Sequence, residues 1–340
     1  MRKLNRRQVL ALMGTTLAAG SFSTQVLAEK KKIKVGALRF TSHAASFIAF
    51  ERGYFADAGL EVEFVFFQAA QPMAVAIASG DIDYAVTAVS GGLISLAQKG
   101  AIKVIGGALS EEAGIDGQKI LVSDAVFQAG GKTPADLNGS NWAVTQSGSS
   151  FHYMGAKIAA AEGIELKFRP LQKVGAIIGA LKSGQVDAWS IVPHIAKPLA
   201  GSGAVHIVGN VADYLPDYQV TTVFTSTRNA SDNRDQTERF LKAFSQGVDD
   251  YAAAMIDKSG GDKGVNDMVD LIHKYVYADR PREKAAPSII NGTMRVSSGA
   301  ALNISSIEDQ LKWFQSEGLV DASITLDTLV DRSYVEITGG

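Results

Sequence analysis

Hydrophobic and polar positions along the chain alternate between two periodicities. Residues 46–59 and 150–163 carry apolar side chains at helical spacing, and each segment ends in a glycine suited to the left-handed turn after a helix. Residues 60–66 and 164–170 alternate between apolar and polar side chains, as a half-buried strand does. Helices and strands in this order predict parallel strands joined by crossover helices.

The same order of elements occurs twice. Phe47 to Asp83 aligns without a gap on Phe151 to Asp187, at a constant offset of 104 residues. In each copy a second helix ends in glycine, and a short apolar strand follows. Asp81, Asp83 and Asp187 come just before these strands, so we interpret them as structural caps. The repeat predicts two α/β lobes, each with a mostly parallel sheet flanked by helices.

Two β-rich segments connect the predicted lobes. Residues 119–127 and 219–227 are rich in valine and threonine, and we expect them to be paired hinge strands. This interpretation assigns residues 29–119 and 222–340 to the first lobe and residues 120–221 to the second.

Composition excludes several classes of function. The formal net charge of the 340 residues is −2 and no long basic run occurs, which argues against nucleic acid as a partner. The chain has no cysteine, so disulfides, zinc thiolates and cysteine nucleophiles are excluded. Its histidines show no metal-ligand spacing, and we expect neither a metal site nor a cofactor. They are His43, His152, His194, His206 and His273.

The N-terminus has the pattern of an export signal. Residues 1–28 consist of a basic head, an apolar middle and small residues at the end, with Val26 and Ala28 at the −3 and −1 positions of a signal-peptidase site. The apolar part is shorter than the roughly 20 residues that span a membrane. The pair Arg6-Arg7 is compatible with the twin-arginine route as well as the general one. We expect cleavage after Ala28 and a periplasmic mature protein.

Three segments carry a resemblance to a known family. "ERGYFADAGLEVEFVFFQ", "AVAIASGDIDYAVTA" and "SGQVDAWSIV" resemble the substrate-binding proteins of ABC importers. The branch in question takes up sulfonates, taurine, nitrate and thiamine precursors and includes the NMT1/THI5-like proteins. The resemblance implies a type II-like periplasmic binding fold, in which two hinge strands join two lobes that close on a small molecule. It also implies that the protein delivers this molecule to a membrane permease. We expect the protein to be a monomer.

The candidate site follows from the topology. In open α/β sheets, ligands bind beyond the carboxyl ends of the parallel strands, often at helix N-termini. The loops at those ends in both predicted lobes supply the candidate ligand-binding residues. They are Arg39, Thr41, Ser42, His43, Gln68, Ser90, Gly91, Ser147, Gly148, Ser149, Ser150, Gln172, Trp189 and His194.

The serine cluster at residues 147–150 has three interpretations. A nucleophile would need the Gly-x-Ser-x-Gly elbow, which "SGSSF" does not fit, and His152 lies in the same helix start. The serines could cap the following helix, which is worth about 1 kcal/mol. We favour a cradle for an anion or polar group, because free N–H groups at a helix start attract anions.

Other residues bear on the ligand. Arg39 could grip a carboxylate or sulfonate with its guanidinium, and Trp189 could form a wall for an organic ligand. Residues 192–194 include no acidic side chain to pair with an ammonium group, which disfavours taurine. Sulfonate, nitrate, and aliphatic or aromatic carboxylate all stay open as the ligand.

Two alternatives to a binding protein share this scaffold. The thiamine-pyrimidine synthases resemble the family, but they carry a cysteine-rich motif and are cytoplasmic. An exported sensor subunit would present its ligand to a receptor rather than to a permease. The lack of cysteine and the export signal favour a binding protein without catalysis.

Overall fold

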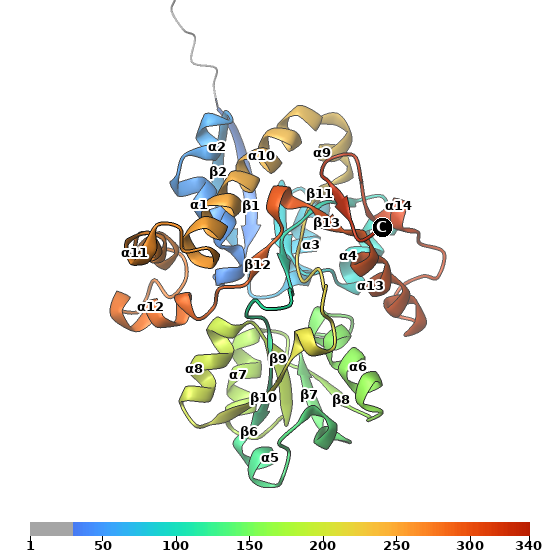
Figure 1. Ribbon diagram of the computed structural model, residues 1–340. Helices are drawn as coiled ribbons and strands as arrows, with labels where there is room; N and C mark the ends of the chain where they lie inside the picture. Colours follow the sequence, from blue (N-terminus) through green and yellow to red (C-terminus); the bar gives the residue numbers. More distant parts are fainter. Residues whose placement is uncertain (1–29) are drawn as a thin grey trace, which may run out of the picture.

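Two five-stranded sheets form the centres of two lobes in residues 30–340, the part of the chain that the computed structural model describes (Figure 1). Helices flank both sheets, so the predicted fold class is confirmed. The predicted signal peptide lies outside the described residues. Within residues 30–340, no helix is both long enough and apolar enough to cross a membrane.

The first sheet has the strand order β2-β1-β3-β11-β4. β1 runs parallel to β2 and β3, whereas β11 lies antiparallel between β3 and β4. Its strands are β1 (Lys31–Ala37), β2 (Leu60–Phe66), β3 (Tyr84–Thr87), β4 (Ile102–Gly107) and β11 (Thr222–Ser226). The helices between them are α1 (Ala44–Glu51), preceded by the 3-10 turn η1 (Thr41–His43), and α2 (Tyr54–Asp57), α3 (Ala70–Ser79) and α4 (Gly91–Gln98).

The second sheet repeats this arrangement in the order β10-β6-β9-β7-β8. β7 is parallel to β8 and β9, and β6 lies antiparallel between β9 and β10. Its strands are β6 (Lys119–Ser123), β7 (Asn141–Val144), β8 (Lys167–Pro170), β9 (Ala188–Ile191) and β10 (Val205–Asn210). Its helices are α5 (Asp124–Gln128), η2 (Pro134–Leu137), α6 (Ser150–Glu162), α7 (Val174–Lys182), α8 (Pro193–Gly201) and η3 (Val211–Asp213). The internal repeat therefore extends to whole sheets, with β6 equivalent to β11.

Equivalent aspartates fix equivalent strands in the two lobes. Asp83 accepts a hydrogen bond from the backbone N–H of Lys34 at 2.8 Å, and Asp187 accepts one from that of Asn141 at 2.6 Å. Each bond ties the start of the third strand of a repeat to the neighbouring first strand. Asp81 only accepts a local bond from Ser79. The interpretation of Asp83 and Asp187 as structural caps agrees with this geometry.

The predicted pairing of residues 119–127 with 219–227 is wrong. β6 and β11 lie in different sheets, because each completes one sheet as its antiparallel strand. The chain crosses between the lobes just before β6 and just before β11, where the backbone N–H of Val220 donates to Leu109 at 2.9 Å and that of Glu111 donates to Tyr218 at 3.0 Å. Leu109–Ser110 (β5) and the segment 218–221 are therefore the paired crossing strands.

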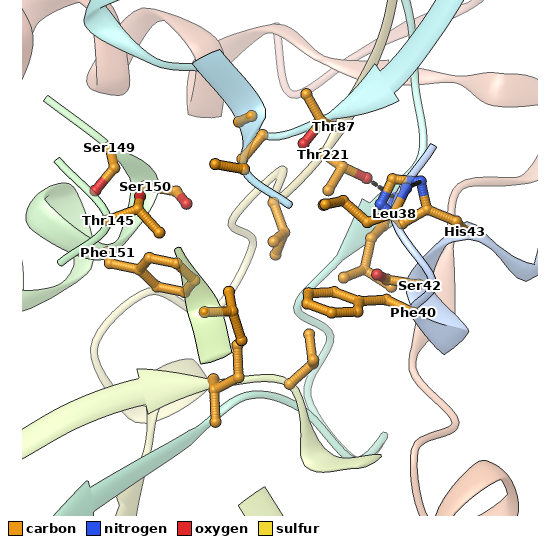
Figure 2. Close-up of a pocket in the computed structure, with 18 of the residues that line it drawn as sticks. Leu38, Phe40, Ser42, His43, Thr87, Thr145, Ser149, Ser150, Phe151 and Thr221 are labelled. Carbon is orange, nitrogen blue, oxygen red and sulfur yellow. Dashed lines mark hydrogen bonds between the residues drawn. The ribbon is translucent and has the colours of Figure 1, made fainter. Parts of the chain in front are cut away.

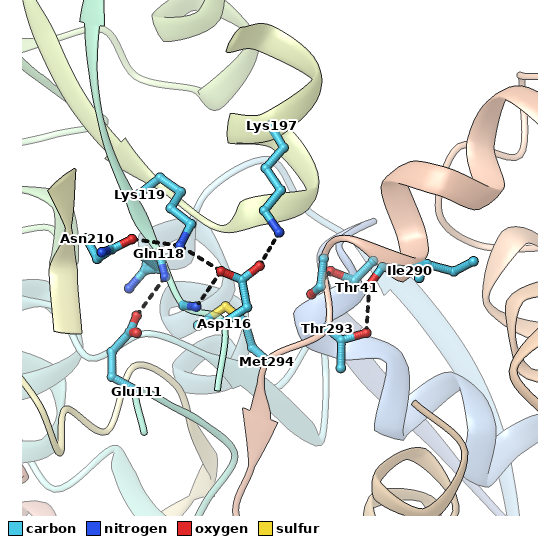
Figure 3. A network of polar contacts seen from close by, with 12 residues as sticks. Thr41, Glu111, Asp116, Gln118, Lys119, Lys197, Asn210, Ile290, Thr293 and Met294 are labelled. Carbon is cyan, nitrogen blue, oxygen red and sulfur yellow. Dashed lines mark hydrogen bonds and ion pairs between the residues drawn. The ribbon is translucent and has the colours of Figure 1, made fainter. Parts of the chain in front are cut away.

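A polar network lies at the second-lobe end of this hinge (Figure 3). Asp116 forms ion pairs with Lys119, at 2.6 Å, and with Lys197 on α8. Glu111 accepts a hydrogen bond from the backbone N–H of Gln118 at 3.1 Å, and its other carboxylate oxygen is buried without a partner among the described residues. Burial raises the pKa of Glu111 to about 7.

The C-terminal third of the chain packs on the first lobe and reaches the second. α12 contacts α8, and α13 contacts α6, so the lobes are bridged on both sides (Figure 1). Its helices are α9 (Thr227–Asp232), α10 (Arg234–Tyr251), the π-helical η4 (Ala252–Ile256), α11 (Gly261–His273), α12 (Arg282–Ile290), η5 (Ser298–Ala300), α13 (Ile304–Ser316) and α14 (Leu326–Leu329). Its strands are β12 (Arg295–Val296), β13 (Leu302–Asn303) and β14 (Ile337–Thr338).

Candidate functional site

A cavity lies between the lobes at the carboxyl ends of the parallel strands (Figure 2). It contains about 590 Å³ of atom-free space, part of which is continuous with solvent. Leu38 follows β1, Thr87 ends β3, Thr145 follows β7 and Ile191 ends β9, and all four line the cavity. The cavity has the position that the topology predicts for a ligand site.

Five helices begin at the cavity. Within residues 30–340, no side-chain hydrogen bond caps the first turn of any of them, although the N–H of Ala44 at the start of α1 donates to the carbonyl of Thr41 in η1. The cavity-lining residues at these starts are His43 before α1, Ala69 and Ala70 at α3, Ser149 and Ser150 at α6, Val174 at α7, and Val192 before α8. Such a convergence of helix N-termini favours a negatively charged ligand.

The start of α6 has the most open donors. Ser149 occupies the N-cap position with a side chain that makes no capping bond, and its hydroxyl has no partner although the residue is only 5% exposed. The backbone N–H groups of Ser150 and Phe151 have no acceptor among the described residues either. All three donors belong to the start of α6, which lines the cavity. A buried hydroxyl that lacks a partner costs about 1–3 kcal/mol, which a bound polar group would offset.

The geometry does not support a serine nucleophile. His152 accepts a hydrogen bond from the backbone N–H of Gly148 at 3.1 Å, so its Nδ1 is engaged with the loop rather than with Ser149 or Ser150. Burial lowers the pKa of His152. Hydroxyl and base are therefore not arranged for proton transfer.

No charged side chain from the described part of the chain lines the cavity. Its polar wall consists of hydroxyls, amides and the imidazole of His43. Burial lowers the pKa of His43 to about 3, so this ring is neutral near pH 7. Its Nδ1 accepts from the backbone N–H of Leu38 at 3.4 Å, which leaves Nε2 to carry the proton.

Two phenyl rings face each other across the cavity, Phe40 from the first lobe and Phe151 from the second (Figure 2). Phe151 packs edge-on against Trp189, with ring centroids 5.4 Å apart. Phe40 packs edge-on against His194 at 5.2 Å. Each ring is thus held from behind while its exposed side faces the cavity.

The structure brings five of the predicted site residues to the cavity wall. They are Ser42, His43, Gln68, Ser149 and Ser150.

Five more predicted residues lie where the lobes touch. Gly91 donates its backbone N–H to the carbonyl of Gly148 at 2.9 Å, and Thr41 is hydrogen-bonded through Oγ1 to Nδ1 of His194 at 2.9 Å. Ser90 caps α4 with its side chain beside the first of these contacts. These residues hold the two lobes together around the cavity rather than line it.

Arg39 lies outside the cavity, contrary to the prediction that it grips the ligand. Its exposed guanidinium sits 3.8 Å from the ring centroid of Phe66 and donates to the carbonyl of Tyr275 at 3.2 Å. The aromatic face and the carbonyl together hold the cation on the outer surface of the first lobe.

Three other predicted residues also do not reach the cavity. Ser147 and Gln172 are exposed, and the left-handed backbone of Gln172 (φ 68°) turns the chain away after its N–H bonds Thr145 at 2.8 Å. Trp189 is fully buried inside the second lobe and supports Phe151 from behind. The aromatic wall is therefore Phe151, one layer in front of the predicted tryptophan.

Sequence reasoning did not select several residues of the wall. Phe40, Thr145 and Phe151 lie within the loops that the strand ends indicated, but they were not among the candidate residues named from those loops. Gln118 and Thr221 come from the segments that cross between the lobes. These two residues line the cavity only because of how the lobes meet, and the sequence pattern of a single segment does not indicate that arrangement.

The sequence matches one known protein family. The family profile described as NMT1/THI5 like matches residues 40–254. No curated protein matches the chain in sequence.

Solved structures share the fold at low sequence identity. The alkanesulfonate-binding protein SsuA from Xanthomonas axonopodis pv. citri, bound to MOPS, is 18% identical with a TM-score of 0.69, over 89% of this chain and 99% of that one. The periplasmic aliphatic sulphonate-binding protein SsuA from Escherichia coli is 18% identical with a TM-score of 0.66, over 89% and 98%. The periplasmic nitrate-binding protein NrtA from Synechocystis PCC 6803 is 14% identical with a TM-score of 0.68, over 88% and 84%.

Proposed function

The chain belongs to the NMT1/THI5-like family, and on that premise we propose that it is a solute-binding protein of an ABC importer. It captures a small organic anion between its lobes in the periplasm and delivers it to a membrane permease. The neighbours in fold support this role, since they are named as sulfonate-binding and nitrate-binding proteins.

The observation that carries the proposal is the set of uncapped helix starts around an uncharged cavity. An anion accepts hydrogen bonds from free N–H groups and hydroxyls, and the helix dipoles supply positive potential without a basic side chain. A cation would meet the same dipoles and no carboxylate. A neutral ligand would leave the potential unused.

Both lobes contribute to the site, which is what a clamp requires. Ser42 and His43 come from the first lobe, and Ser149 and Ser150 come from the second. A ligand that touches both pairs has more contacts when the lobes are together than when they are apart. Its binding therefore shifts the hinge equilibrium toward the closed arrangement, which a permease can recognise.

Catalysis is the second candidate, because one neighbour in fold is the enzyme DszB. A cysteine-to-serine mutant of that enzyme, bound to biphenyl-2-sulfinic acid, is 14% identical with a TM-score of 0.55, over 90% of this chain and 97% of that one. The present chain has no cysteine, and no base within residues 30–340 is hydrogen-bonded to the Ser149 hydroxyl. We infer that the bound anion leaves unchanged.

Thermal denaturation of the mature protein with a panel of anions tests the proposal. The panel holds nitrate, alkanesulfonates, and aliphatic and aromatic carboxylates. A ligand at 100 times its dissociation constant adds about 2.7 kcal/mol to the free energy of unfolding, which raises the melting temperature of a chain of this size by roughly 4 °C. The proposal fails if no anion in the panel shifts the transition. Recovery of a chemically altered ligand would instead establish an enzyme.

A further inference from the structure

We propose that the ligand is an aromatic acid with one anionic group, its acid at the start of α6 and its ring between Phe40 and Phe151. This inference rests on the proposed function and narrows it. It combines three features of the cavity: one group of free donors, no charged side chain in the described wall, and two opposed phenyl rings.

The acidic group belongs at the start of α6. Ser149 combines a buried, unpartnered hydroxyl with a position at the N-cap of a 13-residue helix. The N–H groups of Ser150 and Phe151 add two donors beside it. Carboxylate and sulfonate both present several acceptor oxygens, so either group can accept from more than one donor at this helix start.

The absence of charge in the described wall limits the ligand to one anionic group. A second carboxylate would find only the bare starts of α3, α7 and α8, where the described residues offer no buried unpartnered hydroxyl like that of Ser149, so its charge would be poorly compensated. An ammonium group would face five helix N-termini with no carboxylate in the described wall to pair with it. Dianions and zwitterions are therefore excluded in favour of monoanions.

The ring belongs between the two phenylalanines. Phe151 points into the cavity directly after the donors of α6, so a ring attached to the acid extends along its face (Figure 2). Phe40 closes the other side from the opposite lobe. The cavity wall also includes the aliphatic side chains of Ile191, Val192 and Val220. Aromatic rings prefer aromatic partners beyond the effect of buried area alone, so a planar ring gains contacts that a saturated ring lacks.

Isothermal titration calorimetry of the mature protein at pH 7.5 tests the inference. The matched pair is benzoate and cyclohexanecarboxylate, which share charge and approximate size but differ in the ring. Benzenesulfonate tests the alternative acid, phthalate tests a second charge, benzamide tests a neutral ring, and methanesulfonate and nitrate test anions without a ring. We expect benzoate or benzenesulfonate to bind about tenfold tighter than cyclohexanecarboxylate, and phthalate and benzamide to bind at least tenfold more weakly than the better of the two.

Variants locate the two ends of the ligand. Phe151→Leu should remove most of the preference for the aromatic ring, while Phe50→Leu, a half-exposed phenylalanine on α1, should leave it unchanged. Ser149→Ala should weaken the aromatic acid about tenfold to a hundredfold, because it removes one hydrogen bond to a charged group. Ser147→Ala, in the exposed part of the same loop, should have no effect. Phe40→Leu serves as the second ring variant if Phe151→Leu does not fold, as judged by its thermal transition.

The outcomes separate this inference from the proposed function. Equal binding of benzoate and cyclohexanecarboxylate, or binding of methanesulfonate or nitrate alone, overturns the aromatic ligand and leaves the anion-binding clamp in place. Tight binding of phthalate overturns the limit of one charge. If no anion binds, both proposals fall.

Discussion

His194 makes the contact between the lobes sensitive to pH. It lies on α8 of the second lobe, yet its surroundings belong to the first: Oγ1 of Thr41 lies 2.9 Å from its Nδ1, Phe40 packs edge-on at 5.2 Å, and Tyr277 donates to its carbonyl at 2.9 Å. The ring is 1% exposed. Separation of the lobes would therefore expose this imidazole to water.

The magnitude of the effect follows from the pKa. Burial, and to a smaller extent the neighbouring His43, lowers the pKa of His194 from 6.5 to about 3. An exposed ring in the open arrangement keeps its ordinary value and binds a proton below pH 6.5, whereas the closed arrangement excludes that proton until about pH 3. Acid therefore favours opening. At pH 5, about 1.5 pH units below 6.5, the shift costs about 2 kcal/mol, or about thirtyfold in ligand affinity.

Calorimetric titration of a bound sulfonate between pH 8 and pH 5 measures this loss, since a sulfonate stays ionised over that range. His194→Gln keeps a hydrogen-bonding side chain without a titrating ring, and it should flatten the profile. His206→Gln, which removes a ring paired with Asp124 elsewhere on the second lobe, should not. An affinity that is constant from pH 8 to pH 5 in the unaltered protein would refute the reasoning, as would an unchanged slope in His194→Gln.

Three further predictions concern stability and export. Burial raises the pKa of Glu111 from 4.5 to about 7, so the folded protein holds this proton over a pH range in which the unfolded chain loses it. The free energy of unfolding should therefore fall by about 3 kcal/mol as the pH rises across that range. Urea unfolding should show that Glu111→Gln removes the fall, while Glu61→Gln at an exposed strand position does not. Asp83→Ala and Asp187→Ala should each lower the free energy of unfolding by about 1–3 kcal/mol, because the first leaves the backbone N–H of Lys34 without its acceptor and the second leaves that of Asn141 without its acceptor. Mass spectrometry of the periplasmic protein should place the mature N-terminus directly after Ala28, and an intact N-terminus would contradict the export signal.

The architecture could be predicted from the sequence because it is repeated. The constant offset between Phe47–Asp83 and Phe151–Asp187 reports two copies of one folding unit, and local periodicity reports the elements within each copy. The hinge was misplaced because β6 and β11 are β-rich for a different reason, as the antiparallel strand of each sheet. Valine and threonine content indicates a strand but not its partner.

A residue could be predicted to line the cavity only where the position of its backbone alone places it there. Ser42, Ser149 and Ser150 line the cavity because helix starts at strand ends must face it. Arg39 has a long side chain, and its direction depends on Phe66, which lies on a neighbouring strand. Trp189 does not line the cavity because it lies in the middle of β9, and the last residue of that strand, Ile191, reaches the cavity instead.

A crystal structure of the protein with 4-bromobenzenesulfonate tests the central claim, because the anomalous signal of bromine locates the ring independently of the sulfonate. The uncapped start of α6 predicts sulfonate oxygens within hydrogen-bond distance of the Ser149 hydroxyl and of the backbone N–H groups of Ser150 and Phe151, with the bromine directed away between the lobes. A sulfonate bound by Arg39, or at any place outside the space between the lobes, would contradict the claim that the start of α6 holds the anion.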